Sequence, residues 1–424
     1  MTSPKKPKAK AGIMIDLSLL RDNPEKIISL IKEKDPEYNI QGLLDLDKKV
    51  RVLKVDVETL RCKKNELAKQ GWQEVTPQLR QESKELGKKL KELEKELVEA
   101  EKSFKALYLR CPNIPQQDVP AGGKDRNVVM KEFGKQPTFT FPIKDHIVLG
   151  KELGWLDFEV AATMTGSNFA FYKGDAVKLM YALTMFMLKN NIEYGFNPVL
   201  PPYMVNEKSL TVASNFPKFR DQVYDVCDED LFMSPTSEVN LANVYRGKIL
   251  AAEQLPVRMT AWTSCFRREA GAYGAAERGL IRIHQFEKVE LFTLCEPQES
   301  HAELDRMISC AENILQKLGL HYRISLLAAQ DCSFPSAKTY DIEVWMPGRN
   351  EYYEVSSCSN CTDFQARRGL IRYKKAGDTK ATLVNTLNGS SLALPRLMVA
   401  IMETYQQEDG SIAIPECLKK EALY

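Results

Sequence analysis

The chain has 424 residues, enough for two or three domains of ordinary size and at least one large buried core. Hydrophobic residues make up 44% and charged residues 27%, a composition typical of globular proteins. The 59 Lys and Arg nearly balance the 57 Asp and Glu, which excludes binding of nucleic acid through gross positive charge, so any nucleic acid would be recognised by a local surface or by shape.

The N-terminal segment and the apolar stretches predict no membrane association. Four lysines lie between residues 5 and 10, but Asp16 interrupts the apolar residues that follow, so the segment does not resemble a signal peptide. The longest apolar stretch, 176–188, contains Lys178 and is shorter than the roughly 18 residues that a membrane helix needs. The ten cysteines are scattered without the spacing of a disulfide framework. We therefore expect a cytoplasmic protein.

Two segments on either side of residues 71–77 carry apolar residues at alternating spacings of three and four, the a/d pattern of a coiled coil. One slot of the first segment is taken by Lys64. Gly71 and Pro77 stop helices, so the pattern predicts an antiparallel hairpin over about 43–107, about 40 Å long. A dimerising coiled coil would show the same periodicity. The apolar positions are Leu43, Leu46, Val50, Leu53, Val57, Leu60 and Leu67, then Leu86, Leu90, Leu93, Leu97, Ala100, Phe104 and Leu107.

The remainder of the chain alternates short β-rich segments with helices. Residues 111–123 hold three prolines and two glycines and predict a linker. Beyond it, strands such as 280–292 and 339–346 and helices such as 175–189 and 300–318 predict an α+β body on a mainly antiparallel sheet with flanking helices. We therefore expect an N-terminal domain over 1–110, a linker over 111–135 and a body over 136–424.

Chemistry-bearing residues gather on two expected strands, 259–269 and 280–292, which a glycine-rich loop joins. Alternation puts Arg267 and Glu269 on one face of the first strand. On the second strand it groups Arg282, His284, Phe286, Lys288 and Glu290. Arginine binds phosphate, phenylalanine stacks on a flat ring and a carboxylate accepts from an amine, so this face predicts a ligand with all three groups. A solvated sheet face with cross-strand ion pairs is the alternative.

Two further segments carry chemistry. Residues 388–396 open an apolar helix over 397–405, and Arg396 in its first turn needs an anionic partner, which the helix N-terminus also attracts. Cys358 and Cys361 have the C-x-x-C spacing of a metal knuckle, but a closed zinc site needs two more ligands. No second such pair exists, and the histidines at 146, 284, 301 and 321 are isolated, so we expect no zinc.

Taken together, these segments resemble the motifs of bacterial-type seryl-tRNA synthetases, which are class II aminoacyl-tRNA synthetases. Residues 266–271 with 278–290 resemble motif 2, and 388–396 with the helix after it resemble motif 3. Residues 166–202 resemble motif 1, the helix and strand through which the family dimerises. Segments 236–238, 354–357 and 358–368 also fall where the family carries them, and the hairpin is similar to its tRNA-binding arm. The resemblance covers about residues 14–416.

The resemblance implies an enzyme that activates L-serine with ATP and transfers it from seryl-adenylate to the 3′ end of tRNA-Ser, releasing AMP and pyrophosphate. It also implies a homodimer through motif 1, charging of tRNA-Sec where that tRNA occurs, and Mg²⁺ bound with ATP. By position, Arg267 would hold the α-phosphate and Arg396 the γ-phosphate, while Glu269 would contact the adenine end and Phe286 would stack on adenine.

The implied sites follow residue by residue. Catalytic residues would be Arg267, Glu269 and Arg396; ATP would be bound by Arg267, Arg268, Glu269, Ile283, Phe286, Glu354, Val355, Ser356, Ser357 and Arg396; serine by Thr236, Ser237, Glu238, Arg267, Glu290, Asn388 and Ser390; and Mg²⁺ by Glu354 and Ser357.

Some positions depart from the family's pattern. Ala275 and Ala276 replace a basic and an acidic residue in the motif 2 loop, Ser237 replaces a common alanine, and Asn168 replaces a common arginine. The departure at 275–276 concerns the contact with the tRNA acceptor end.

Related proteins with the same catalytic body offer other interpretations. Amino acid:carrier-protein ligases lack the long arm, and a coiled-coil protein with an inactive body would have lost Arg267, Glu269 or Arg396. Prolyl, threonyl and glycyl enzymes usually add an anticodon-binding domain after motif 3, whereas only 28 residues follow Arg396. The seryl family therefore remains the interpretation that fits the sequence.

Overall fold

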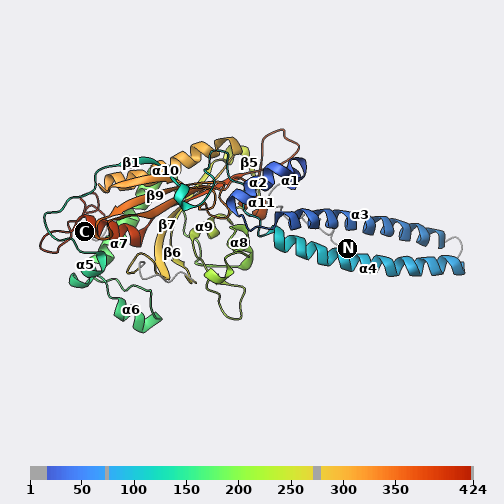
Figure 1. Cartoon of the computed structure of the whole chain (residues 1–424), viewed down its shortest axis with the longest axis horizontal. Coiled ribbons are helices and arrows are strands. Elements are labelled where there is room, and N and C mark those ends of the chain that lie inside the picture. Colours follow the sequence, from blue (N-terminus) through green and yellow to red (C-terminus); the bar gives the residue numbers. More distant parts are fainter. Residues whose placement is uncertain (1–16, 72–75, 271–277, 422–424) are drawn as a thin grey trace. The chain divides into compact units, whose positions relative to one another are not determined.

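The computed structural model describes residues 17–71, 76–270 and 278–421 (Figure 1). The chain forms two compact units, a smaller one over Asn23–Pro112 and a larger one over Asn113–Tyr424 together with Met1–Asp22. The lysines of the N-terminal segment and the motif 2 positions Ala275 and Ala276 lie outside the described residues. In the described part of the chain, no helix is long and apolar enough to cross a membrane.

The smaller unit is a helical hairpin with one further helix. Figure 1 shows α3 and α4 running side by side in opposite directions. Thr76 caps α4 by accepting a hydrogen bond from the backbone N–H of Leu79, and Pro77 occupies the first turn, where its missing N–H costs nothing. The hairpin expected over about 43–107 is therefore present. The helices are α2 (Pro24–Lys34), α3 (Ile40–Gly71) and α4 (Pro77–Tyr108).

The predicted seam closes within the chain. Val50, Leu53 and Ala100 are buried together, and apolar side chains of α4 pack against them. On the flanks of the hairpin, ion pairs cross from α3 to α4: Lys49 with Glu96 (2.9 Å), Lys54 with Glu101 (2.8 Å) and Arg61 with Glu94 (2.8 Å). Because these pairs are largely exposed, each contributes below about 1 kcal/mol. The apolar seam therefore supplies most of the stability of the hairpin.

Lys64, the charge in the seam, lies opposite a glycine. Its Nζ is 3.9 Å from the position that a Cβ on Gly87 would occupy. At that distance a Cβ would make ordinary van der Waals contact with the lysine, so the Lys64 side chain passes close to Gly87. The interruption that the sequence shows in α3 is thus matched by a small residue in α4.

The larger unit is α+β, as predicted, and is built on an eight-stranded sheet in the order β1-β8-β9-β10-β13-β7-β6-β2. All neighbours are antiparallel except β2 and β6. Its strands are β1 (Val128–Phe133), β2 (Asn197–Pro198), β6 (Val257–Phe266), β7 (Gln285–Cys295), β8 (Tyr322–Leu326), β9 (Lys338–Met346), β10 (Glu351–Asn360) and β13 (Asn385–Ala393). A two-stranded sheet pairs β3 (Met204–Val205) with β4 (Phe232–Met233), and a three-stranded sheet places β11 (Arg372–Lys374) between β5 (Ile249–Ala251) and β12 (Thr382–Leu383).

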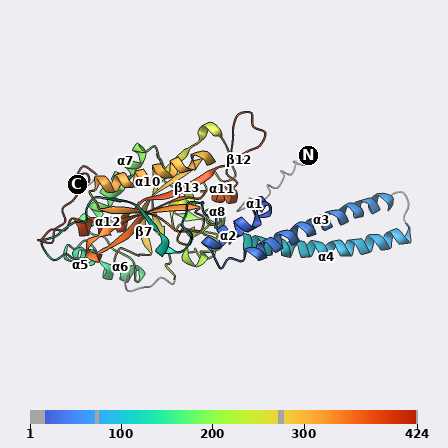
Figure 2. The ribbon, with the colours of Figure 1, turned by 45° about the horizontal axis from the view of Figure 1, so that its top comes forward.

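Helices pack on both faces of the large sheet, and a second core sets α8, α9 and α11 against Met259, Phe292 and Leu294. The main core joins α7, α10 and α12 to strand residues such as Val289, Leu291, Ile342 and Val344. Figure 2 shows α10 lying against this sheet. Strand alternation turns the intervening residues toward the opposite face. The helices of this unit are α1 (Leu17–Asp22), α5 (His146–Glu152), α6 (Phe158–Thr165), α7 (Asp175–Glu193), α8 (Glu207–Val212), α9 (Ser237–Leu241), α10 (Ser300–Lys317), α11 (Phe364–Gly369) and α12 (Leu394–Thr404), with short 3₁₀ turns η1 (Lys124–Arg126), η2 (Arg220–Gln222), η3 (Ala252–Gln254), η4 (Pro297–Glu299) and η5 (Pro347–Arg349).

The two strands expected to carry the chemistry are bounded differently from the prediction. β6 ends at Phe266, so Arg267 and Glu269 follow it, and β7 begins at Gln285, so Arg282 and His284 precede it. The reason is local: Glu269 has a φ of 48°, in the left-handed region, which an extended strand cannot contain. The backbone N–H of Arg267 still donates to the carbonyl of His284 (2.8 Å) and keeps the two segments together.

The linker is shorter than predicted. The Asn113 side-chain amide donates to the carbonyls of Pro335 (2.8 Å) and Cys361 (2.9 Å), which fixes the chain to the larger unit from that residue on. Further along, β1 lies inside the expected linker and pairs with β8. Proline-rich sequence favours extended backbone, but extended backbone also packs against a folded unit. The boundary between the units therefore falls between Pro112 and Asn113.

Candidate active site

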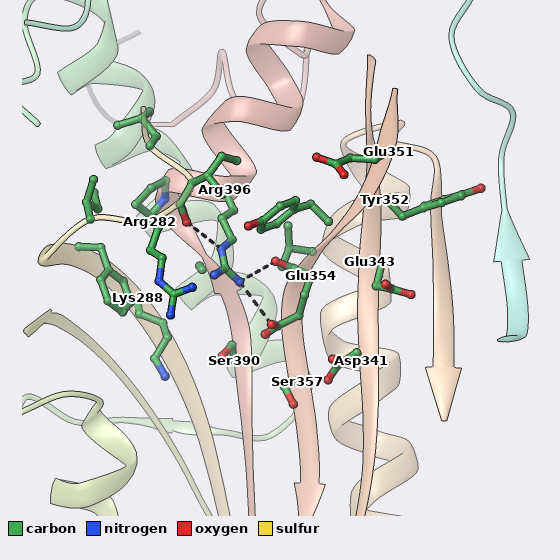
Figure 3. A pocket seen from close by; sticks show the side chains of 18 of the residues that line it. Arg282, Lys288, Asp341, Glu343, Glu351, Tyr352, Glu354, Ser357, Ser390 and Arg396 are labelled. Carbon is green, nitrogen blue, oxygen red and sulfur yellow. Dashed lines mark hydrogen bonds and ion pairs between the residues drawn. The ribbon is translucent and has the colours of Figure 1, made fainter. Parts of the chain in front are cut away.

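A cavity of about 680 Å³ opens in the larger unit, on the sheet face opposite the core of α7, α10 and α12 (Figure 3). Its walls come from the segments around β6 and β7, from β9 and β10, and from the first turn of α12. The predicted site residues that line it are Arg267, Glu269, Ile283, Phe286, Glu354, Val355, Ser357, Ser390 and Arg396. Residues from separate segments of the sequence thus share one cavity.

Two arginines approach the cavity from different elements. Arg396 donates from Nη1 to the Glu354 carbonyl (2.9 Å) and from Nε to the Ile281 carbonyl (3.3 Å), with the Glu354 carboxylate 3.4 Å from Nη1. Arg267 donates from Nε to the Pro235 carbonyl (3.2 Å). A guanidinium has five N–H donors, so backbone carbonyls can fix its orientation while other donors serve a phosphate.

A flat aromatic surface lies beside one of these arginines. The Phe286 ring centroid is 5.1 Å from the Arg267 guanidinium carbon. A third arginine, Arg282, is paired by a 2.6 Å contact between its Nε and the Glu269 carboxylate. That pairing offsets the charge of Arg282, and the longer contact with Glu354 offsets part of the charge of Arg396, so Arg267 is the arginine of the three without a carboxylate partner among the described residues.

The opposite wall is acidic. Asp341 on β9 stands in register with Ser357 on β10, next to Glu354. Burial and the Glu354 carboxylate raise the pKa of Asp341 well above its usual range. The Asp341 Oδ1 atom is buried and has no hydrogen-bond partner among the described residues. An unpartnered buried carboxylate oxygen beside a second carboxylate and a hydroxyl fits Mg²⁺, which prefers oxygen ligands and leaves several positions to water and phosphate.

A polar cluster adjoins the cavity on β7. The Thr236 hydroxyl donates to the Glu290 carboxylate (3.1 Å) and accepts from Lys288 Nζ (2.8 Å), and Lys288 also forms an ion pair with Glu290. Ser390 on β13 faces Glu290 across the strand pair. The cluster gathers hydroxyl and carboxylate groups in a small buried space, which suits a small ligand with hydrogen-bond donors.

Glu238 contributes the second carboxylate of this cluster. Its Oε1 accepts from the side-chain amides of Gln365 (2.7 Å) and Asn388 (3.0 Å). Burial, and secondly the negative charge of Glu290, raises the pKa of Glu238 to about 7. The pair of carboxylates is therefore prepared for a cationic or strongly donating ligand, which would relieve their repulsion.

Three predicted contact residues, Arg268, Ser237 and Ser356, belong neither to the cavity lining nor to the adjoining polar cluster, whereas Thr236, Glu238, Glu290 and Asn388 belong to that cluster. The Arg268 backbone N–H donates to the Gln222 carbonyl (2.9 Å), and the Ser356 hydroxyl donates to the Ser390 carbonyl (2.5 Å). The Ser237 hydroxyl is buried without a hydrogen-bond partner among the described residues. Neighbouring positions in an extended segment face opposite ways, so a motif that is continuous in sequence cannot present every residue to one ligand.

The structure adds residues to which the sequence analysis gave no role in the site, although Lys288 had been grouped on the strand face predicted to bind a ligand. Lys124, Asn127, Lys288 and Asp341 line the cavity, and Gln365 contacts Glu238. Strand alternation along 340–344 could have indicated Asp341, because it places Asp341 and Glu343 on one face and Ile342 and Val344 on the other. Lys124 and Asn127 carried no signal, because only the course of the chain before β1 brings them to the cavity.

Both cysteines of the C-x-x-C pair are buried and take part in the packing of the larger unit. Cys358 lies in the main core, and the Cys361 sulfur accepts from the Asn388 amide (3.3 Å). Across residues 17–71, 76–270 and 278–421, no group of three or more His, Cys, Asp or Glu is placed to hold a metal ion. A Mg²⁺ that arrives with a nucleotide needs fewer protein ligands because phosphate oxygens supply the others.

Converging arginines, a phenylalanine and an acidic wall on a mainly antiparallel sheet are the features expected of a class II aminoacyl-tRNA synthetase core. Residues 221–405 match the family described as "tRNA synthetase class II core domain (G, H, P, S and T)". Residues 14–115 match the "Seryl-tRNA synthetase N-terminal domain". One match therefore covers the smaller unit, and the other covers residues 221–405 of the larger unit.

Similar proteins narrow the class to one family. The serine–tRNA ligase of Desulfotalea psychrophila is 44% identical over 96% of this chain and 98% of its own length. That of Thermoanaerobacter pseudethanolicus is 45% identical with the same coverage. The crystal structure of seryl-tRNA synthetase from Pyrococcus horikoshii complexed with ATP superposes with a TM-score of 0.90 at 35% identity, covering 96% of this chain and 98% of that one. The chain belongs to the seryl-tRNA synthetase family and is a serine–tRNA ligase.

Proposed function

We propose that the cavity with its adjoining polar cluster is where this ligase activates L-serine with ATP. The observation that carries the proposal is the convergence of Arg267 and Arg396 on one cavity that also holds Phe286 and an acidic wall. Phosphate, a flat base and a divalent cation each find a matching group there.

Within this site, Arg267 holds the α-phosphate and Arg396 the γ-phosphate, Phe286 stacks on adenine, and Glu269 contacts the adenine end while it orients Arg282. The serine carboxylate attacks the α-phosphorus, and pyrophosphate leaves. A ribose hydroxyl at the 3′ end of the tRNA then attacks the carbonyl of the adenylate, and AMP leaves. No side chain needs to act as a nucleophile, because positioning and neutralisation of phosphate charge supply the catalysis.

Glu354 and Ser357 are the residues that we propose hold Mg²⁺, and the unpartnered Oδ1 of Asp341 beside them supports an oxygen-rich cation site. When bound, Mg²⁺ neutralises phosphate charge. The contribution of the chain is to hold Glu354, whose carbonyl and carboxylate both contact Arg396, so that cation and arginine act on the same phosphates.

Serine recognition falls to Thr236, Glu238, Glu290, Asn388 and Ser390. The ammonium and the hydroxyl of serine are divided between the two glutamates, and Lys288 offsets part of the negative charge of Glu290. Ser237 and Arg268, which do not line the cavity, act at most by shaping it. A small pocket with two carboxylates selects a small amino acid with two donor groups.

The hairpin unit is the proposed binding site for tRNA-Ser, and for tRNA-Sec where it occurs. The match of residues 14–115 to the seryl N-terminal domain supports this assignment. Between residues 61 and 95 the sequence has 10 Lys and Arg against 6 Asp and Glu, so the turn-proximal half of the hairpin carries the excess cations that phosphate contacts require. Double-stranded RNA is read mainly by its form, which suits a rigid helical arm.

We propose a homodimer through motif 1. Tyr181, Met185 and Ile192 share one stripe of α7 and are 44%, 38% and 51% exposed, and Leu200 is 76% exposed. Large apolar side chains that gather in this way on a surface are typical of protein–protein contacts. The ten free cysteines suit a reducing compartment, which supports placing the enzyme in the cytoplasm.

ATP–pyrophosphate exchange with each of the twenty amino acids tests the function. We expect serine to drive exchange fastest, and alanine to be slower by about 10⁴-fold because it lacks the hydroxyl that the pocket binds. Threonine adds only a methyl group and should be discriminated less strongly. Faster exchange with any other amino acid would contradict the proposal.

A further inference from the structure

A histidine and a glutamate to which the resemblance assigned no role form a buried pair near the wall of the cavity. His146 begins α5 and Glu403 lies in the last turn of α12, and both side chains are almost fully buried. The Glu403 Oε1 atom is 3.0 Å from the His146 backbone nitrogen and 3.0 Å from its Nδ1. The pair joins two elements that are 257 residues apart in sequence.

The hydrogen bonds of this pair fix the tautomer of the imidazole. The backbone N–H of Leu280 donates to His146 Nε2 at 3.2 Å. Since Nε2 accepts, the proton of the neutral ring lies on Nδ1 and is donated to Glu403. The imidazole therefore links the buried Glu403 carboxylate to the backbone N–H of Leu280 and fixes the position of that N–H.

That amide belongs to the wall of the cavity. Leu280 and Ile281 line it, and the Ile281 carbonyl accepts from Arg396 Nε (3.3 Å). Gly279 is required at the approach, because a Cβ there would lie 2.2 Å from His146 Nε2 and because its φ is +71°. A chain of contacts thus runs from Glu403 through His146 and residues 280–281 to the guanidinium of Arg396.

Glu403 also holds a second part of the wall. Its Oε2 accepts from the backbone N–H of Gly348 at 3.0 Å, in the η5 turn that carries the cavity residue Arg349. Arg396 and Glu403 lie two turns apart on the same short helix. One rigid helix therefore carries a cavity arginine and, through one carboxylate, fixes both backbone segments beside it.

We propose that His146 and Glu403 are positioning residues for ATP, which hold the 280–282 segment and thereby the orientation of Arg396. Neither residue touches the nucleotide. The inference rests on the proposed assignment of the cavity to ATP. It predicts that a disturbed pair weakens ATP binding while the serine cluster on β7 keeps its geometry.

Two variants separate positioning from bulk stability. Gln at 146 places an amide near the position of Nε2 and can accept from Leu280, whereas Asn reaches only the position of Nδ1 and leaves that N–H unpaired. We expect H146N to raise the KM for ATP and its equilibrium Kd by about 10-fold, the effect of one unpaired buried donor, with the KM for serine changed less than about two-fold. H146Q should recover most of the ATP affinity.

The measurements are exchange kinetics, ATP binding and thermal unfolding of the full-length H146N, H146Q and E403Q variants. If H146N does not fold, E403Q carries the test, because a glutamine amide replaces one of the two acceptor oxygens and should raise the KM for ATP in the same way. Equal loss in H146N and H146Q, or equal effects on ATP and serine, would overturn the positioning role.

R396A distinguishes this failure from a failure of the site assignment. If R396A weakens ATP binding and the His146 and Glu403 variants do not, the positioning proposal alone is wrong. If R396A also leaves ATP binding unchanged, the assignment of the cavity to ATP is wrong.

Discussion

Replacement of Glu238 by glutamine should stabilise the larger unit at alkaline pH while it impairs serine activation. The pKa of Glu238 is raised from 4.5 to about 7, first by burial and then by Glu290. Between pH 4.5 and about pH 7, Glu238 keeps its proton in the folded state but has lost it in the unfolded state. The contribution of Glu238 therefore makes the free energy of unfolding fall as the pH rises, and the full cost is reached above about pH 7.

The size of the effect follows from the shift. At about 1.36 kcal/mol for each pH unit, full burial would cost roughly 3 kcal/mol, and we expect about 2 because the side chain keeps some contact with solvent. Glutamine is neutral at every pH and retains an oxygen that can accept from Gln365 and Asn388. E238Q should therefore match the wild type near pH 5 and exceed it by about 2 kcal/mol near pH 8.

Urea unfolding at both pH values, followed by tryptophan fluorescence, measures this difference. Trp155, Trp262 and Trp345 lie in the larger unit, and the remaining tryptophan of the sequence falls in the range of the smaller unit, so the signal reports mainly on the unit that holds Glu238. E253Q, at an exposed position, controls for the loss of one charge. An advantage of E238Q that is the same at both pH values, or absent near pH 8, would refute the reasoning. The same variant should lower serine-dependent exchange by at least about 10-fold, through loss of a charge-assisted hydrogen bond.

Three further predictions concern the phosphate contacts and the hairpin. R267A and R396A should each slow exchange by at least about 10²-fold, as loss of one transition-state donor does, and near-normal exchange in both folded variants would contradict the assignment. Replacement of residues 43–107 by a short flexible linker should keep exchange within a few-fold and lower tRNA charging by orders of magnitude. If the variant is monomeric by mass measurement and loses both activities, the hairpin serves as a dimer clasp instead. Full tRNA charging by the variant would refute the tRNA role of the hairpin. G87A should stabilise the hairpin by about 1 kcal/mol and slow amide hydrogen exchange in α4, because alanine favours helix and its Cβ would lie 3.9 Å from Lys64 Nζ. Faster amide hydrogen exchange in G87A would show that Lys64 needs the space at Gly87.

The hairpin could be predicted from sequence because its determinants are local and periodic. The positions of Val50, Leu53 and Ala100 follow from the heptad spacing alone, and one chain supplied both halves of the seam. The cavity residues Arg267, Phe286 and Arg396 could be predicted because they lie in contiguous motifs. Their orientation toward one cavity depended on long-range pairing, which only the resemblance to a family supplied.

The remaining site features depend on register and on contacts between distant segments. Asp341 faces Ser357 because of the pairing of β9 with β10, which includes an irregularity between Glu354 and Ser356 that no local pattern announces. In the sequence His146 is an isolated histidine, because its partner Glu403 lies 257 residues away. The predicted bounds of the two strands were wrong, because the left-handed Glu269 follows closely on the end of the first strand and because residues 279–284 form turns and bends before the second strand begins.

The anchoring of Arg267 and Arg396 by backbone carbonyls affects the enzyme between catalytic cycles. A carbonyl has no net charge, so the charge of Arg267 persists before ATP arrives and after the nucleotide has left, whereas the charge of Arg396 is partly offset by the Glu354 carboxylate 3.4 Å away. Any small polyanion that reaches the cavity then competes with ATP for the same donors. Sulfate or phosphate in an assay buffer should act as an inhibitor competitive with ATP. A singly charged anion such as chloride, compared at the same ionic strength, should act mainly by screening charge.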